Sequence, residues 1–179
     1  RLKHSDFINT RKKSFLSDIN AIIISTMKTV SSKNHLSKLI DELSELQKLY
    51  PLDLPHPNPR NQTKPLRENR MYYVKRKRLN ELSPKIGTLT ESEIIELASL
   101  TIFLNKTCFN GLWRMNSNGE FNTPEGAYTL PNNICQELIL LKCNELFSSS
   151  SLKVQDWKKS LKSAKKGDLV YIDPPYMPL

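Results

Sequence analysis

The chain has 179 residues, enough for one domain. Apolar side chains make up 38% of the residues, and 27 lysines and arginines face 18 acidic residues, so the formal net charge is +9. This positive surplus favours a polyanionic partner, with nucleic acid first and an anionic membrane surface second. No stretch approaches the roughly 18 apolar residues of a membrane-spanning helix. The cysteines, Cys108, Cys135 and Cys143, have no CxxC spacing, which favours a reducing compartment over a disulfide framework or a zinc site.

The first half of the chain is predicted to contain a short strand and several helices. Apolar spacing places them over residues 15–18, 20–30, 34–50 and 66–82. The last of these segments is strongly basic and includes Tyr72 and Tyr73. It is typical either of a helix that contacts phosphates or of a solvated helix face whose tyrosines turn inward, and the residues leave both interpretations open.

The second half alternates helices with shorter elements. Thr90 and Glu93 form a capping box, which opens a helix that runs to about Lys106. Residues 108–128 are rich in Asn, Gly and aromatic side chains, which predicts an irregular hairpin. The patterning then predicts a helix over 133–146, a strand over 152–154, a helix over 157–164 and a final strand over 168–172.

The final predicted strand leads into Asp173-Pro174-Pro175-Tyr176. Such a strand would bring Asp173 to the carboxyl edge of a sheet, where α/β proteins bind ligands, and the prolines stiffen the turn. The Asp173 carboxylate and the Pro174 carbonyl could then accept hydrogen bonds from an exocyclic amine, while Tyr176 offers a ring face. A strand followed by an ordinary proline turn is the alternative.

Two further motifs each carry a functional interpretation and a plain structural one. Asp18 lies between a predicted strand and a predicted helix, where a carboxylate either accepts hydrogen bonds from ribose hydroxyls or caps the helix. Within the predicted hairpin, Arg114 can contact guanine bidentately, and Asn110 can pair with a base edge or a phosphate. Phe109 and Leu112 can wedge between bases. A polar loop with a few apolar anchors is the alternative.

These motifs, in this order, resemble the Dam-type (class alpha) DNA adenine-N6 methyltransferases, which use S-adenosyl-L-methionine. The resemblance spans nearly the whole chain, and a weaker Tyr-Tyr-x2-Arg-x3-Asn pattern at residues 72–80 also fits. Its main blocks are Ser17-Asp18-Ile19-Asn20, residues 104–124, and Asp173-Pro174-Pro175-Tyr176. The implied fold is α/β: a partial Rossmann-like methyltransferase domain, with an inserted and mostly helical target-recognition region. Residues 1–54 and 136–179 would form the methyltransferase domain, and residues 55–135 the recognition region.

The resemblance also implies a role for each motif. Asp18 would hold the cofactor ribose, and Asp156 and Trp157 would lie near the cofactor's adenine. A catalytic clamp around a flipped adenine would consist of Asp173, Pro174, Pro175 and Tyr176. The implied DNA-binding residues are Phe109, Asn110, Leu112, Arg114, Asn116, Pro124 and Arg76.

The implied function is site-specific methylation of adenine N6 in double-stranded DNA, with GATC as the default target and no metal ion. The expected partners are double-stranded DNA and a cognate restriction endonuclease, with no membrane. The expected location is a bacterial or phage-type cytoplasm, in association with the nucleoid.

The sequence departs from the family pattern at two places. No glycine precedes Phe7, where the family has a Gly-rich cofactor loop, and we therefore expect a fragment that lacks this loop and the C-terminal strands. Glu125-Gly126-Ala127 replaces an aromatic residue, Gly and Arg, which removes a basic contact. Two alternatives remain open: a truncated or decayed fragment that binds DNA without catalysis, and an amino-methyltransferase acting on cytosine N4, RNA or a protein glutamine.

Overall fold

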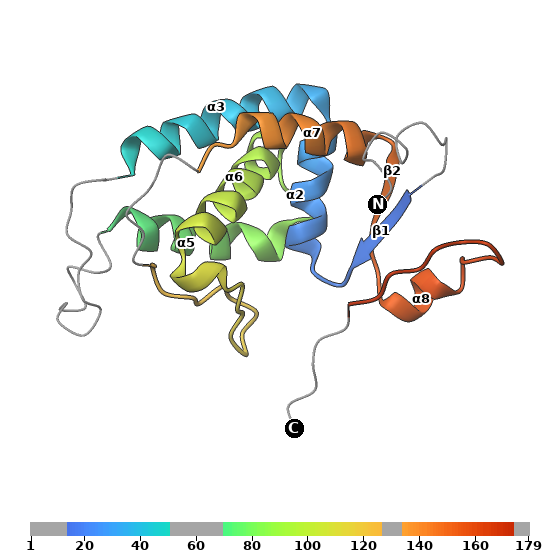
Figure 1. Ribbon diagram of the computed structural model, residues 1–179. Coiled ribbons are helices and arrows are strands. Elements are labelled where there is room, and N and C mark those ends of the chain that lie inside the picture. Colours follow the sequence, from blue (N-terminus) through green and yellow to red (C-terminus); the bar gives the residue numbers. More distant parts are fainter. Residues whose placement is uncertain (1–13, 51–69, 127–133, 174–179) are drawn as a thin grey trace.

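A helical body carries a pair of parallel strands along one side (Figure 1). The computed structural model describes residues 14–50, 70–126 and 134–173. The elements in these ranges are β1 (Ser14–Asp18), α2 (Ala21–Ser31), α3 (Lys33–Leu49), α5 (Met71–Leu82), η1 (Ser83–Lys85), α6 (Glu91–Thr107), η2 (Phe109–Gly111), α7 (Glu137–Ser148), β2 (Ser150–Val154) and α8 (Trp157–Leu161). No helix in the described ranges is both long enough and apolar enough to cross a bilayer.

Helix α6 lies at the centre of the helical body. The predicted capping box starts it: Glu93 N donates to Thr90 Oγ1 at 3.3 Å, and Thr90 N donates back to Glu93 Oε2 at 3.0 Å. The helix is buried on several faces, as expected for an element that other helices surround. Its buried side chains are Ile95, Leu97, Ala98, Ser99, Leu100, Thr101, Phe103, Leu104 and Thr107.

Helices α2 and α3 confirm the predicted apolar spacing. Asn20 caps α2 by accepting a hydrogen bond from Ile22 N at 3.0 Å, and Ser32 caps α3. The leucine stripe of α3 is buried in the core, at Leu36, Leu39, Leu43 and Leu46. The same core includes side chains from α5, α6 and α7, so helices on both sides of residue 55 share it. The predicted division into domains stays a prediction.

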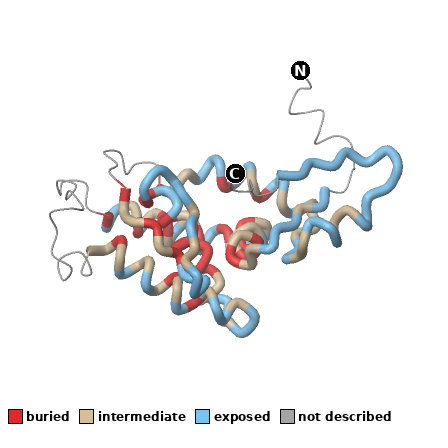
Figure 2. The backbone as a smooth tube through the Cα atoms, turned by 90° about the horizontal axis from the view of Figure 1, so that it is seen from below, coloured by how far each residue is buried: buried red, intermediate tan, exposed pale blue. Residues whose placement is uncertain are grey.

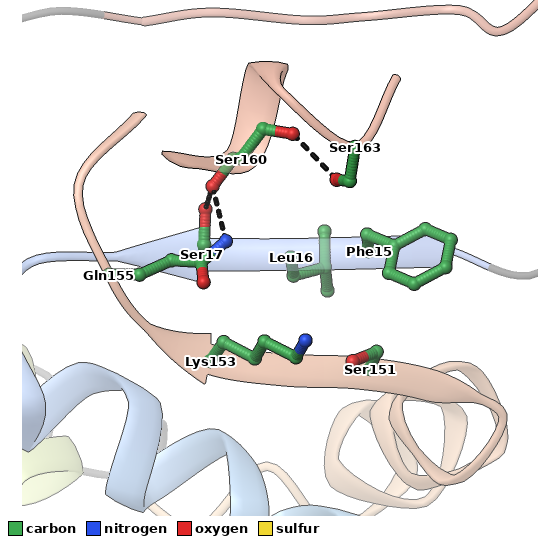
Figure 3. Close-up of a pocket in the computed structure, with 8 residues that line it drawn as sticks. All are labelled: Phe15, Leu16, Ser17, Ser151, Lys153, Gln155, Ser160 and Ser163. Carbon is green, nitrogen blue, oxygen red and sulfur yellow. Dashed lines mark hydrogen bonds between the residues drawn. The ribbon is translucent and has the colours of Figure 1, made fainter. Parts of the chain in front are cut away.

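The two strands form the sheet edge that positions part of the site. β1 and β2 pair in parallel, from Ser14 opposite Ser150 to Asp18 opposite Val154. Helices α2 and α7 lie on one side of this pair, and α8 lies on the other (Figures 1 and 3). Because parallel strands end at the same edge, the residues after Asp18 and after Val154 are brought together. The mixture of helices and strands agrees with the predicted α/β class, whereas the Rossmann-like arrangement stays a prediction.

The predicted strand over residues 168–172 is wrong for this structure. These residues have no ladder partner within the described ranges, and they form no strand. Leu169 is 90% exposed and Tyr171 is 86% exposed, and Figure 2 shows the chain after α8 as exposed along its length. A run of β-forming residues becomes a strand only when a neighbouring strand accepts its backbone hydrogen bonds. Asp173 therefore does not lie at the end of a strand.

Candidate active site and DNA interface

Two predicted cofactor carboxylates meet at the carboxyl edge of the strand pair. Asp18 ends β1, and Gln155 N donates to Asp18 O at 3.0 Å, which draws Asp156 to the same edge. One oxygen of each carboxylate has a local role: Asn20 N donates to Asp18 Oδ1 at 2.7 Å, and Lys158 N donates to Asp156 Oδ1 at 2.8 Å. Within the described ranges, no hydrogen bond occupies the other oxygen of either carboxylate. Asp156 is the N-cap of α8, whereas the N-cap of α2 is Asn20 and not Asp18. The backbone hydrogen bond that each carboxylate accepts is therefore compatible with ligand binding through its other oxygen.

The aromatic ring beside this edge is half exposed. Trp157 is the first residue of α8 and is 49% exposed, and Lys158 Nζ lies 5.6 Å from the ring centroid. About half of the Trp157 side chain is therefore accessible to solvent. The resemblance placed Asp156 and Trp157 near the cofactor's adenine, and the structure adds that Asp156 follows a residue that is hydrogen-bonded to Asp18.

A small pocket lies between α8 and the strands rather than at their carboxyl edge. Figure 3 shows Ser17, Gln155 and Ser160 joined by hydrogen bonds across it, with Gln155 Nε2 donating to Ser160 Oγ at 2.8 Å. Its volume is about 70 Å³, whereas small-molecule sites occupy roughly 300–1,000 Å³. We therefore treat it as packing space under α8 and not as the binding site of a nucleoside-sized ligand.

The predicted catalytic turn is only partly described. Asp173 is the last described residue of the exposed segment that follows α8. Pro174, Pro175 and Tyr176 lie outside the described residues. The structure thus brings Asp18 and Asp156 to one sheet edge. The sequence predicted that a final strand would bring Asp173 to this edge as well, and the structure does not show such a strand within the described ranges.

The predicted hairpin is present and projects from the end of α6 (Figure 1). Antiparallel bridges join Cys108 to Glu125 and Met115 to Phe121. At its tip, Asn116 Oδ1 accepts hydrogen bonds from Asn118 N at 3.0 Å and Glu120 N at 2.9 Å. Asn116, one of the predicted DNA contacts, therefore shapes the turn. Gly119 has φ +75°, a left-handed conformation that glycine adopts without strain.

The first limb of the hairpin presents most of the predicted DNA-binding side chains to solvent. Phe109 is 49% exposed and Leu112 is 55% exposed. Asn110 is also exposed and has φ +53°, in the left-handed region that Asn tolerates better than most residues. Arg114 is exposed, and Pro124, on the returning limb, is half-buried. Four of these five side chains are thus exposed, and their contact with DNA stays a prediction.

The returning limb is clamped by one face of helix α5. Tyr72 Oη donates to Thr123 O at 3.0 Å, and Arg76 Nη1 donates to the same carbonyl at 3.1 Å. Asn80 makes a reciprocal pair with the backbone of Phe121: its Nδ2 donates to Phe121 O at 3.1 Å, and Phe121 N donates to its Oδ1 at 2.8 Å. These three side chains lie four residues apart and therefore share a helix face.

One face of the basic helix is thus turned toward the protein interior. Tyr72 is buried, as the inward-facing interpretation predicted, and the Arg76 guanidinium also lies 4.9 Å from the centroid of the Tyr73 ring. Arg78 pairs with Glu96 through two hydrogen bonds, at 2.9 and 2.7 Å. The DNA contact predicted for Arg76 stays a prediction, and its guanidinium already has protein partners. The sequence reasoning missed Asn80 as a clamp, although the spacing of Tyr72, Arg76 and Asn80 carries that signal.

An ion pair closes the base of the hairpin. Arg70 Nε donates to Glu125 Oε2 at 2.7 Å, and Tyr50 Oη donates to Glu125 Oε1 at 2.8 Å. The Arg70 side chain is 17% exposed and that of Glu125 is 7% exposed. Burial, and then the adjacent Glu125 carboxylate, raises the pKa of Tyr50 well above its usual value. Glu125 stands where the sequence departs from the family pattern, and its carboxylate is bound by Arg70 and Tyr50.

Comparison with known proteins decides the family of the chain. A model of the D12 class of N6 adenine-specific DNA methyltransferases matches residues 5–179. The chain belongs to this family. The match includes the two strands, the hairpin and the sequence Asp173-Pro174-Pro175-Tyr176, so all three sequence blocks of the resemblance fall inside the D12 region.

Individual D12 relatives cover different parts of the chain. It is 33% identical over 168 residues to the type II methyltransferase M.MjaIII of Methanocaldococcus jannaschii, which covers 94% of this chain and 52% of the relative. It is 36% identical over 115 residues to the type II methyltransferase M1.LlaDCHI of Lactococcus lactis subsp. cremoris, covering 63% and 39%. A DNA adenine methylase of Serratia marcescens is 37% identical over 90 residues, covering 50% and 33%. The chain thus spans about half or less of the length of these curated relatives.

Proposed function

We propose that this D12 chain provides the base-clamping turn, part of the cofactor site and the DNA-reading hairpin of an enzyme that methylates adenine N6 in double-stranded DNA, with GATC as the first candidate target. The observation that carries the proposal is the match of residues 5–179 to the D12 family. The proposal is supported by a projecting hairpin whose DNA-type side chains are exposed and by two carboxylates at one sheet edge. The +9 charge favours a nucleic-acid partner.

The residues at the strand edge fit S-adenosyl-L-methionine. Asp18 and Asp156 each keep one carboxylate oxygen that could accept a ribose hydroxyl or an adenine amine. Trp157 offers a half-exposed ring against which an adenine can stack. The cofactor, when bound, supplies an activated methyl group on its sulfonium.

The hairpin suits the displacement of a base from the duplex. An adenine inside the stack cannot be reached, so it must be flipped out at a cost of a few kcal/mol. Phe109 and Leu112 are exposed apolar side chains that could fill the gap left in the stack. Arg114, on the same limb, is free to contact a base edge in the major groove.

Asp173 and its neighbours are the proposed clamp for the flipped adenine. The Asp173 carboxylate and the Pro174 carbonyl would each accept one hydrogen bond from the N6 amino group, while Tyr176 would stack on the ring. These contacts orient the nitrogen lone pair toward the methyl group, and such positioning supplies much of the rate. The carboxylate also stabilises the positive charge that develops on N6 during attack.

A second candidate function is DNA binding without methyl transfer. The exposed, unpaired conformation of residues 168–173 favours it, because a clamp needs rigid support. It differs from the first proposal only in the chemistry, since both use the hairpin.

One experiment separates these functions. The chain is expressed in cells that lack adenine methylation, and their DNA is digested with an endonuclease that N6-methyladenine in GATC blocks. The modified bases are then identified by mass spectrometry. We expect protection of GATC and the appearance of N6-methyladenine. Protection at other sequences would contradict only the assignment of GATC as the target. The appearance of N4-methylcytosine or of modified RNA would favour the alternative substrates. Unmodified DNA that the protein still binds would favour binding without catalysis.

A further inference from the structure

The guanidinium of Arg114 is held on one side only. Asn122, directly across the hairpin, accepts a 2.9 Å hydrogen bond from Arg114 Nε through its Oδ1. The two residues are also joined through the backbone, since Asn122 N donates to Arg114 O at 3.1 Å. Within the described ranges, neither Nη atom of Arg114 has a hydrogen-bond partner. The end of the guanidinium that bears both Nη atoms is therefore free, while the Nε side is fixed.

Asn122 is itself fixed from below by helix α5. Arg76 Nη1 donates to Asn122 O at 3.3 Å and to the adjacent Thr123 carbonyl. On the other side of Asn122, the Asn80 side chain pairs with both backbone polar groups of Phe121. The backbone of residues 121–123 is thus tied to a helix that is anchored in the core, which restricts the position of the Asn122 amide.

We propose that Asn122 is a positioning residue for base reading, which directs the two Nη atoms of Arg114 outward as a preformed fork. The proposal rests on the proposed function, because it assigns the orientation of an arginine that is taken to read DNA. A guanine in the major groove presents O6 and N7, which match two parallel N–H donors. Fixing the guanidinium plane before binding reduces the side-chain entropy that is lost on contact.

The chemistry of Asn122 suits this role better than a carboxylate would. Its amide oxygen accepts the Nε hydrogen bond without neutralising the arginine, so the full positive charge stays available to the electronegative edge of guanine. A carboxylate at this position would pair with the arginine and repel phosphates. Asn122 therefore orients Arg114 while leaving the charge on its free end.

The first test measures the orientation without DNA. In the full chain labelled with ¹⁵N, the Nε–H signal of Arg114 is assigned by its loss in Arg114→Lys. We expect Asn122→Ala to increase the solvent exchange rate of this proton severalfold and Asn122→Asp to restore its protection. Asn118→Ala, a change at the exposed tip of the same hairpin, is the matched control and should leave the signal unchanged. An exchange rate that Asn122→Ala does not alter would overturn the proposal whatever the protein binds.

The second test measures sequence preference on DNA. The comparison sequence has another base in place of the guanine of the target. We expect Asn122→Ala to lower the preference for the target over this sequence by roughly tenfold, which is the discrimination that a bidentate arginine–guanine contact provides. The same change should have little further effect in an Arg114→Ala background. Equal weakening on all sequences, with a salt dependence reduced by one phosphate contact, would make Asn122 a phosphate ligand and overturn the positioning role. If the unchanged protein shows no sequence preference, the proposed function fails, and the exchange measurement alone decides the role of Asn122.

Discussion

Glu125 accepts two hydrogen bonds from the guanidinium of Arg70, at 2.7 Å from Nε and 3.1 Å from Nη2, where the hairpin returns to the helical body. Both side chains are largely buried, so removing one would leave the other charge without its partner. We expect Glu125→Ala to lower the free energy of unfolding by about 3 kcal/mol. Urea denaturation followed by circular dichroism measures the change.

The exposed pair between Lys48 and Glu45 is the matched control. Its atoms also approach to 2.7 Å, but the side chains are 70% and 62% exposed. Water solvates such a pair whether or not it forms, so Glu45→Ala should change the stability little. Equal effects of Glu45→Ala and Glu125→Ala would contradict a buried, structural pair at the base of the hairpin.

The protein should lose stability at alkaline pH through its buried tyrosines. Burial raises the pKa of both Tyr50 and Tyr72 above the ordinary value of 10.0. Above about pH 10, the unfolded chain therefore loses these protons more readily than the folded one, and ionisation favours unfolding. We expect the free energy of unfolding to fall as the pH rises above 10, and to fall less steeply in Tyr50→Phe and Tyr72→Phe. Parallel pH curves for the three proteins would exclude these tyrosines as the cause.

The clamp from α5 predicts a local effect at Phe121. Asn80→Ala removes both the donor and the acceptor that pair with the Phe121 backbone. A polar group left unpaired in this way costs about 1–3 kcal/mol, and the Phe121 amide proton should exchange faster with solvent. Amide hydrogen exchange measures this directly, with the core amides of α6 as the internal reference. Unchanged exchange at Phe121 would show that the returning limb is held by other contacts.

Substitutions of Asp18 and Asn20 should separate the loss of cofactor binding from the loss of the helix cap. Asp18→Ala removes a carboxylate oxygen that is open to a ligand, and we expect binding of S-adenosyl-L-methionine to weaken about tenfold or more. Asn20→Ala is the control: it removes the cap of α2, at a cost of about 1 kcal/mol in stability, but keeps the Asp18 carboxylate. Isothermal titration calorimetry measures the affinity. If the two variants bind the cofactor equally well, the assignment of Asp18 to the ribose is wrong.

Local patterns in the sequence predicted the helical part of the fold well. The leucine stripe of α3 and the capping box of α6 depend on residues three or four apart, so their signals survive in the sequence alone. The prediction of a strand over residues 168–172 was wrong because a strand depends on a distant part of the chain. The residues are β-forming, but a strand also requires a neighbouring strand, which residue type does not encode.

The sequence indicated candidate residues for the site but not the contacts between the segments that carry them. The sequence indicated the hairpin and its exposed side chains, as well as Asp18 and Asp156 separately. It could not indicate that Arg70 reaches Glu125 across 55 positions, or that Asn80 reaches Phe121 across 41. Such pairings depend on how α5 packs beside the hairpin, and helix packing is not visible in the spacing of either segment.

We propose that the chain serves the transfer of a methyl group to adenine N6 through Asp173. The most direct measurement incubates the protein with S-adenosyl-L-methionine labelled on its methyl group and with duplex DNA, and then identifies the labelled base. We predict N6-methyladenine with the unchanged chain and none with Asp173→Ala, while Asp168→Ala, a change to an exposed carboxylate nearby, keeps the activity. Label on another base, or N6-methyladenine formed equally by Asp173→Ala, would contradict the account.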